Sequence, residues 1–188
     1  MAVARLGDVT LKIDPSLAPG LQRLEVFGWA HPDADINGLP IVHVDEPDDR
    51  LQTDGSRRAG APDFLLGVVG VDHVVMLADD VRATCSAIER ASGSPLRRVK
   101  EGERGIQGFF RMGSVILEVV ERRLVDPGTG HSGVLWGFVV TVEDLDRVVA
   151  HLGPDVIGSP RPAVQHARRI ATIRRAAGLG VSLAMMTV

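Results

Sequence analysis

Two segments that are otherwise apolar each carry one side chain able to do chemistry. His73 lies in Val69–Met76, a run rich in β-branched residues, and Glu118 lies in the middle of Gly113–Glu121. Runs of this kind are typical of buried strands. A carboxylate buried in such a strand is costly unless it is ionised and paired, protonated or bound to a metal. An imidazole together with a carboxylate suits a divalent transition ion, or magnesium with added waters.

The residues around His73 and Glu118 predict one strand, one helix and three further strands in that order. The helix signal is an apolar stripe that includes Cys85, with Asp79 or Asp80 placed to cap the first turn. A Gly-Ser-Pro sequence ends this helix. The helix is expected at residues 79–91, and the strands are expected at residues 65–77, 96–100, 105–112 and 113–121.

The C-terminal third of the chain shows a weaker copy of the same order. A strand is expected at 134–140, followed by a helix that Thr141 caps, with Asp144 as a shorter equivalent of the capping-box glutamate. Apolar residues recur at helical spacing from Leu145 to Leu152. Further strands are expected near residues 156–157, 168–174 and 180–187, and Gly180 matches Gly113 at the turn before the last strand of each copy.

This order, written twice, resembles the vicinal-oxygen-chelate superfamily, which includes glyoxalase I, bleomycin-resistance proteins and extradiol dioxygenases. The resemblance implies an α+β, glyoxalase-like fold of two βαβββ modules, at residues 65–124 and 134–188, that form a shared cup. A repeat of this kind makes physical sense because each four-stranded sheet has one apolar face that a second copy can cover.

In this superfamily each module offers up to two metal ligands, one from its first strand and one from its fourth. The resemblance therefore implies that His73 and Glu118 are ligands of a divalent metal (Zn, Mn, Ni, Fe or Mg), and that Glu118 is also the candidate catalytic base. The matching residues of the second module are Gly137 and Met185, which cannot ligate a hard cation. The expected ligand set is thus incomplete.

Four alternatives follow from the incomplete set. His166 or His131 joins from a loop to give a His/His/Glu set. Water and substrate fill the open positions. Two chains pair as a homodimer through their first modules, which brings together two copies of each ligand. Alternatively, His73 and Glu118 hydrogen-bond each other without a metal.

Several other side chains are candidates for contacting a small-molecule ligand. Gln107, Phe109 and Arg111 alternate onto one face of a predicted strand, and Trp136 lies beside the empty ligand position of the second module. The segment 160–172 is the most polar stretch near a predicted strand. Within it Gln165, His166 and Arg168 are suited to orient a carboxylate, phosphate or enolate.

The N-terminal 44 residues do not match the repeat. Period-two alternation and turn signals predict strands at 8–14, 21–27 and 39–44, which suggests a small β-meander packed on the modules. Residues 45–64 are rich in charge, proline and glycine without apolar periodicity, and they are expected to be a linker.

Composition narrows the class of protein. The chain has 188 residues, of which 45% are hydrophobic, an ordinary composition for a globular protein. A net charge of −3 argues against a general nucleic-acid binder. A single cysteine excludes an internal disulfide, and the absence of a signal-peptide or membrane-spanning pattern predicts a cytoplasmic location without a membrane partner.

Two functions are the main candidates, and a third, weaker one is a regulatory module whose residues 1–44 contact a partner. The first is a metal-dependent lyase, isomerase or dioxygenase acting on a small oxygen-rich molecule. The second is a metal-free small-molecule binder of the drug-sequestering type, in which a planar ligand stacks against Trp136 or Phe109. A buried His/Glu pair favours the first, and the incomplete ligand set favours the second.

Overall fold

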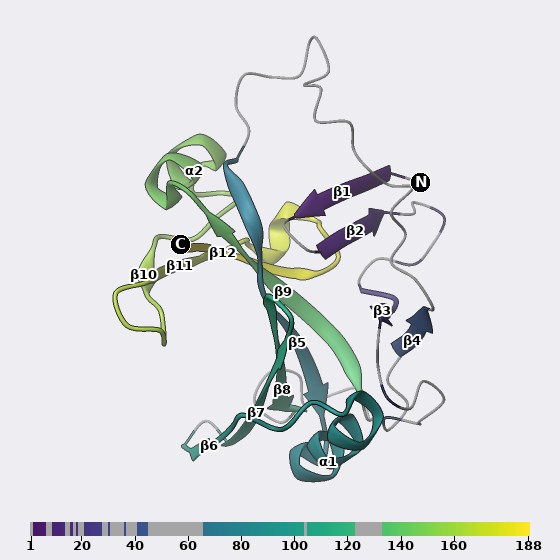
Figure 1. Cartoon of the computed structure of the whole chain (residues 1–188). Coiled ribbons are helices and arrows are strands. Elements are labelled where there is room, and N and C mark those ends of the chain that lie inside the picture. The colour runs from purple at the N-terminus through teal and green to yellow at the C-terminus, as the bar shows by residue number, and fades with distance from the viewer. Residues whose placement is uncertain are drawn as a thin grey trace. The chain divides into compact units, whose positions relative to one another are not determined.

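The structure is a computed structural model of the chain (Figure 1), and it describes residues 2–6, 9–13, 16, 18, 21–27, 30, 36, 41–44, 66–103, 105–122 and 133–188. The chain divides into two compact units. Unit 1 consists of residues 1–18, 48–72 and 138–188, and unit 2 consists of residues 19–47 and 73–137. Among the described residues, no helix has the length and apolar character needed to cross a bilayer.

The described chain contains the β-α-β-β-β order twice, which confirms the predicted α+β fold. The first copy consists of β5 (Val68–Ala78), α1 (Val81–Ser92), β6 (Arg98–Gly102), β7 (Gly105–Met112) and β8 (Val115–Glu121). The second consists of β9 (Val134–Val142), α2 (Leu145–Leu152), β10 (Arg161–Pro162), β11 (Arg169–Thr172) and β12 (Ser182–Thr187), with a short 3-10 helix, η3 (Arg175–Ala177), before β12. Hydrogen bonds join the strands of the first copy in the order β5-β8-β7-β6 and those of the second copy in the order β10-β11-β12-β9.

The two faces of the sheet in unit 2 carry different kinds of side chain. Side chains alternate along each strand, so Met76 of β5 and Val119 of β8 face α1 and form a core with its apolar stripe, which includes Ile88. The opposite face carries His73 and Glu118. Strands β5 and β8 are parallel, with His73 paired to Ile116 and Val75 paired to Glu118. This register puts the two polar side chains on the face that α1 leaves uncovered.

The helix caps follow local sequence signals with one correction. Asp80 caps α1 by accepting a hydrogen bond from the amide of Ala83 at 2.9 Å, and Gly93 ends the helix with φ of 70°. In the second copy the prediction that Thr141 caps the helix is wrong. Asp144 is the N-cap of α2, since its carboxylate accepts from the amide of Arg147 at 2.9 Å, while Thr141 still belongs to β9.

The matched glycines before the last strand of each copy are confirmed as turns. Gly113 has φ of 60° and Gly180 has φ of 69°, a left-handed conformation that glycine adopts without steric cost. The two glycines thus start β8 and β12 in the same way.

The N-terminal region is β-structure, but it is not a meander. Strands β1 (Ala2–Leu6) and β2 (Val9–Ile13) form an antiparallel pair, and β3 (Leu24–Phe27) and β4 (Ile41–Val44) form a separate parallel pair. Leu24, Ile36 and Ile41 pack against the α1 core of unit 2. This part of the chain therefore belongs to the two units rather than to a domain of its own. The predicted linker lies outside the described residues.

Cys85 is a core residue. It lies on the buried face of α1, where its sulfur packs directly over Gly108 of β7. Burial raises the pKa of the Cys85 thiol to about 11, with a further increase from the Glu89 carboxylate. The thiol therefore stays protonated at neutral pH and does not act as a nucleophile.

Candidate functional site

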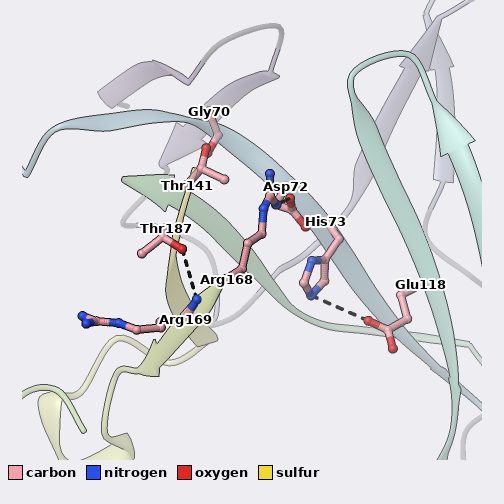
Figure 2. Close-up of polar contacts among 8 residues, drawn as sticks. All are labelled: Gly70, Asp72, His73, Glu118, Thr141, Arg168, Arg169 and Thr187. Carbon is pink, nitrogen blue, oxygen red and sulfur yellow. Dashed lines mark hydrogen bonds and ion pairs between the residues drawn. The ribbon is translucent and has the colours of Figure 1, made fainter. Parts of the chain in front are cut away.

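His73 and Glu118 lie together on the sheet face of unit 2 that is opposite α1 (Figure 2). The Nε2 atom of His73 is 3.6 Å from the Oε2 atom of Glu118, and the two side chains are 13% and 15% exposed. The contact arises from the parallel register of β5 and β8, in which Glu118 lies one pleat diagonally from His73. An imidazole thus lies beside a largely buried carboxylate, which needs a polar partner in such a position.

Gln107 completes a triad with these two residues. Its Nε2 amide donates a hydrogen bond of 3.0 Å to the Oε1 atom of Glu118. The two oxygens of the carboxylate are therefore engaged by different partners, Gln107 at one and His73 at the other. The sequence suggested that Gln107 contacts a ligand, whereas the structure shows that it also orients Glu118.

Apolar side chains border the triad in the same unit. Trp136 packs against a small cluster formed by Val75, Leu77 and Val120. Phe109 of β7 is the cross-strand partner of Glu118 and is half-buried, and Arg111, two residues further along, is exposed. The expected ligand-contacting residues of β7 and β9 thus include two aromatic side chains, Phe109 and Trp136, in the unit that contains the triad.

His73 and Glu118 are placed so that they could be two ligands of one divalent cation. Two ligands of one tetrahedral zinc, each bound at about 2.0–2.2 Å, lie roughly 3.3–3.6 Å apart. The separation of 3.6 Å between His73 Nε2 and Glu118 Oε2 is at the upper end of that range. Within the part of the chain that the structure describes, no cluster of three or more His, Cys, Asp or Glu side chains is arranged as a metal site.

The other residues named as alternatives are placed as follows. Met185 is buried in β12, where it pairs with Ala171 of β11, and Gly137 is a buried residue of β9. His166 lies in the loop between β10 and β11 of unit 1. His131 lies outside the described residues.

Unit 1 contains a second polar cluster, built on Asp72 and Arg168. The Nη1 atom of Arg168 donates to the Oδ1 atom of Asp72 at 2.7 Å, and the two side chains are 30% and 11% exposed. Arg169 is engaged elsewhere, because its amide donates to Thr187 at 3.0 Å and its guanidinium pairs with Asp146. Sequence reasoning missed Asp72, although an acidic residue in an apolar strand was the same signal that singled out Glu118.

The loop that carries Arg168 is strained at one residue. The amide of Arg168 donates to the carbonyl of Gln165 at 3.3 Å, which closes a four-residue turn. Ala167 has φ of 63°, the left-handed region that favours glycine at the third position of such a turn. Residues 162–169 line a cavity of about 500 Å³ around this turn.

We expect Ala167→Gly to raise the free energy of unfolding by roughly 0.5–1 kcal/mol. Relief of the left-handed strain outweighs the extra entropy of glycine in the unfolded chain. Ala163→Gly is the matched control in the same loop, where φ is ordinary and glycine should destabilise instead. Urea unfolding of both variants measures the difference, and equal destabilisation by the two would contradict the assignment of strain.

The arrangement of strands and helices is that of a glyoxalase-like fold. No family model matches the chain, and no curated protein matches it significantly. A methylmalonyl-CoA epimerase from Mycobacterium tuberculosis superposes with a TM-score of 0.53 and 17% identity, over 64% of this chain and 89% of that chain.

Two further solved structures show the same likeness. A variant methylmalonyl-CoA epimerase from Streptomyces coelicolor, in complex with 2-nitronate-propionyl-CoA, has a TM-score of 0.50 and 17% identity, over 62% of this chain and 95% of that chain. A hypothetical protein from Bacillus halodurans has a TM-score of 0.51 and 11% identity, over 63% and 93% of the two chains. At these identities the likeness is one of fold, and it confirms the glyoxalase-like fold expected from the order of elements.

Proposed function

We propose that this glyoxalase-like protein binds a small oxygen-rich molecule at the triad of His73, Glu118 and Gln107, with a divalent cation held by His73 and Glu118. The observation that carries the proposal is the 3.6 Å separation of an imidazole nitrogen and a carboxylate oxygen that are both largely buried. Two protein ligands leave the remaining coordination positions to water and to oxygens of the bound molecule.

Each residue of the triad has a distinct task in this proposal. Glu118 supplies a negative charge and an oxygen that can accept a proton. His73 lies at the Oε2 atom of Glu118 and supplies the second ligand, and Gln107 fixes the orientation of the carboxylate through its hydrogen bond. A bound cation would act as a Lewis acid on an oxygen of the ligand. An isomerase-type proton transfer would use Glu118 as the base once its carboxylate has left the cation.

The fold comparisons are compatible with an isomerase-type proton transfer. Two of the solved structures with this fold are named as epimerases, and one of them was solved with a coenzyme A thioester analogue. An epimerase moves a proton at a carbon centre, which is chemistry that a buried carboxylate can perform. We therefore place a small acid or thioester with adjacent oxygens first among candidate substrates.

A second function is favoured by a different observation. Trp136 and its cluster of Val75, Leu77 and Val120 form an apolar area beside the triad. A metal-free protein could use this area to stack a planar ligand, with the His73–Glu118 pair serving only as a hydrogen-bonding group. This is the sequestration function of drug-resistance proteins.

Metal titration separates the two functions. Zinc, manganese, nickel, iron or magnesium added to the chelator-treated protein should raise its melting temperature, because a ligand that binds only the native state stabilises it. Elemental analysis of the purified protein identifies the cation, and about one equivalent per chain is expected. A melting temperature unchanged by all five metals would overturn the metal proposal and leave the metal-free binder.

A further inference from the structure

We infer that the loop between β10 and β11 carries a second binding site, for the carboxylate or phosphate group of a small molecule, built on Arg168. The site lies within unit 1 and uses none of the triad residues. The inference therefore does not rest on the proposed function. It is carried by an arginine fixed by an acidic partner, the open cavity beside it and the strained turn that presents it.

Arg168 is held in one orientation by Asp72. The carboxylate of Asp72 is only 11% exposed, and Arg168 Nη1 donates to it at 2.7 Å. A carboxylate buried to this extent needs a cationic partner, so the guanidinium is kept in place by the fold. Arginine has five N–H donors in a rigid fork, and one contact with Asp72 leaves other donors to face a ligand. Figure 2 shows Arg168 reaching toward Asp72 while Arg169 points away.

The loop surrounds an open cavity. It is lined by Pro162, Ala163, Val164, Gln165, His166, Ala167, Arg168 and Arg169. Each arginine has an acidic partner outside this lining, Asp72 for Arg168 and Asp146 for Arg169. Arginine recognises carboxylate and phosphate groups through paired N–H donors. The N–H donors of Arg168 beyond its contact with Asp72 therefore suit an anionic group.

The backbone of the turn supports the same conclusion. Ala167 is held at φ of 63°, and it directly precedes Arg168. It is the one residue other than glycine with a positive φ in the described part of the chain. Residues held in such conformations cluster at ligand-binding sites, where the surrounding structure keeps them in place. Here the strained turn presents Gln165 and His166 beside the fixed guanidinium.

The test uses the full chain and two probes, inorganic phosphate and malonate, followed by amide chemical shifts in ¹H–¹⁵N spectra. We expect saturable shifts that centre on residues 163–169. Arg168→Gln should weaken the tighter-binding probe at least tenfold, because the guanidinium supplies both the charge and the paired donors. Arg168→Lys keeps the charge but loses the fork, and it should weaken that probe at least threefold.

Arg169→Gln is the matched control, since Arg169 lines the same cavity but its guanidinium is engaged by Asp146. Its affinity for either probe should stay within twofold of the wild type. Tighter binding of phosphate assigns a phosphate ligand, and tighter binding of malonate assigns a carboxylate ligand. Equal weakening by Arg168→Gln and Arg169→Gln, or no saturable shift with either probe, overturns the site. If Arg168→Gln does not fold, wild-type affinity in Arg168→Lys overturns it.

Discussion

Glu118→Gln is expected to remove the metal-dependent rise in melting temperature while leaving the metal-free protein nearly as stable as the wild type. The substitution keeps the shape of the side chain and an oxygen that can accept from Gln107. It removes the negative charge that a divalent cation needs. Saturation of a site at about 100 times its Kd contributes about 2.7 kcal/mol, and for a protein of this size that corresponds to roughly 5–10 °C.

The matched control for this variant is Glu143→Gln, an exposed glutamate that should keep the full metal-dependent shift. Gln107→Met tests the orienting hydrogen bond, and it should reduce the shift without abolishing it, because both metal ligands remain. Differential scanning fluorimetry at a fixed metal concentration compares the four proteins. A full shift in Glu118→Gln would show that the cation binds elsewhere.

Gly108→Ala should lower the free energy of unfolding by about 1–3 kcal/mol, the usual effect of overpacking a filled core. A Cβ atom added at Gly108 would meet the sulfur of Cys85, whose short side chain on α1 has little freedom to move away. The contact is made by the helix that covers the sheet face opposite the triad. The expected loss is therefore one of stability and not of ligand binding.

Cys85→Ala offers a rescue that isolates this contact. The single substitution should destabilise the core by about 1 kcal/mol, because it removes buried contacts of the sulfur. In the Gly108→Ala/Cys85→Ala double variant, the added methyl group at position 108 occupies the space that the sulfur has left. The combined loss of stability should therefore be smaller than the sum of the single losses. Gly102→Ala is the control, since a Cβ there meets nothing within 4 Å. Additive losses in urea unfolding would argue against a direct Gly108–Cys85 contact.

Local sequence signals determined the elements and their order. The bounds of β7 agree with the prediction, and α1 is capped by Asp80, one of the two aspartates expected, and by Gly93. The turns at Gly113 and Gly180 were also predictable, because positive φ is a property of the residue and its immediate neighbours. Alternation along the strands then put His73 and Glu118 each on a definite face.

Signals that compete at short range were not resolved by the sequence. Thr141 and Asp144 are both good helix caps, and only the length of β9 decides that Asp144 caps α2. The N-terminal strands were expected to be consecutive and antiparallel, but β3 and β4 pair in parallel. Their pairing depends on where the apolar side chains of Leu24 and Ile41 are buried. Strand pairing of this kind is a long-range property.

The partners of the polar residues were decided by tertiary structure alone. Gln107 meets Glu118 because β7 and β8 pair in a register that brings the two side chains to adjacent positions on one face. Arg168 meets Asp72, 96 residues earlier in the chain, which no local pattern encodes. The sequence by itself determined which side chains need a partner, because a charge in an apolar strand must be compensated. Which residue supplies the compensation depends on register, turn geometry and side-chain reach, and these exist only in the folded chain.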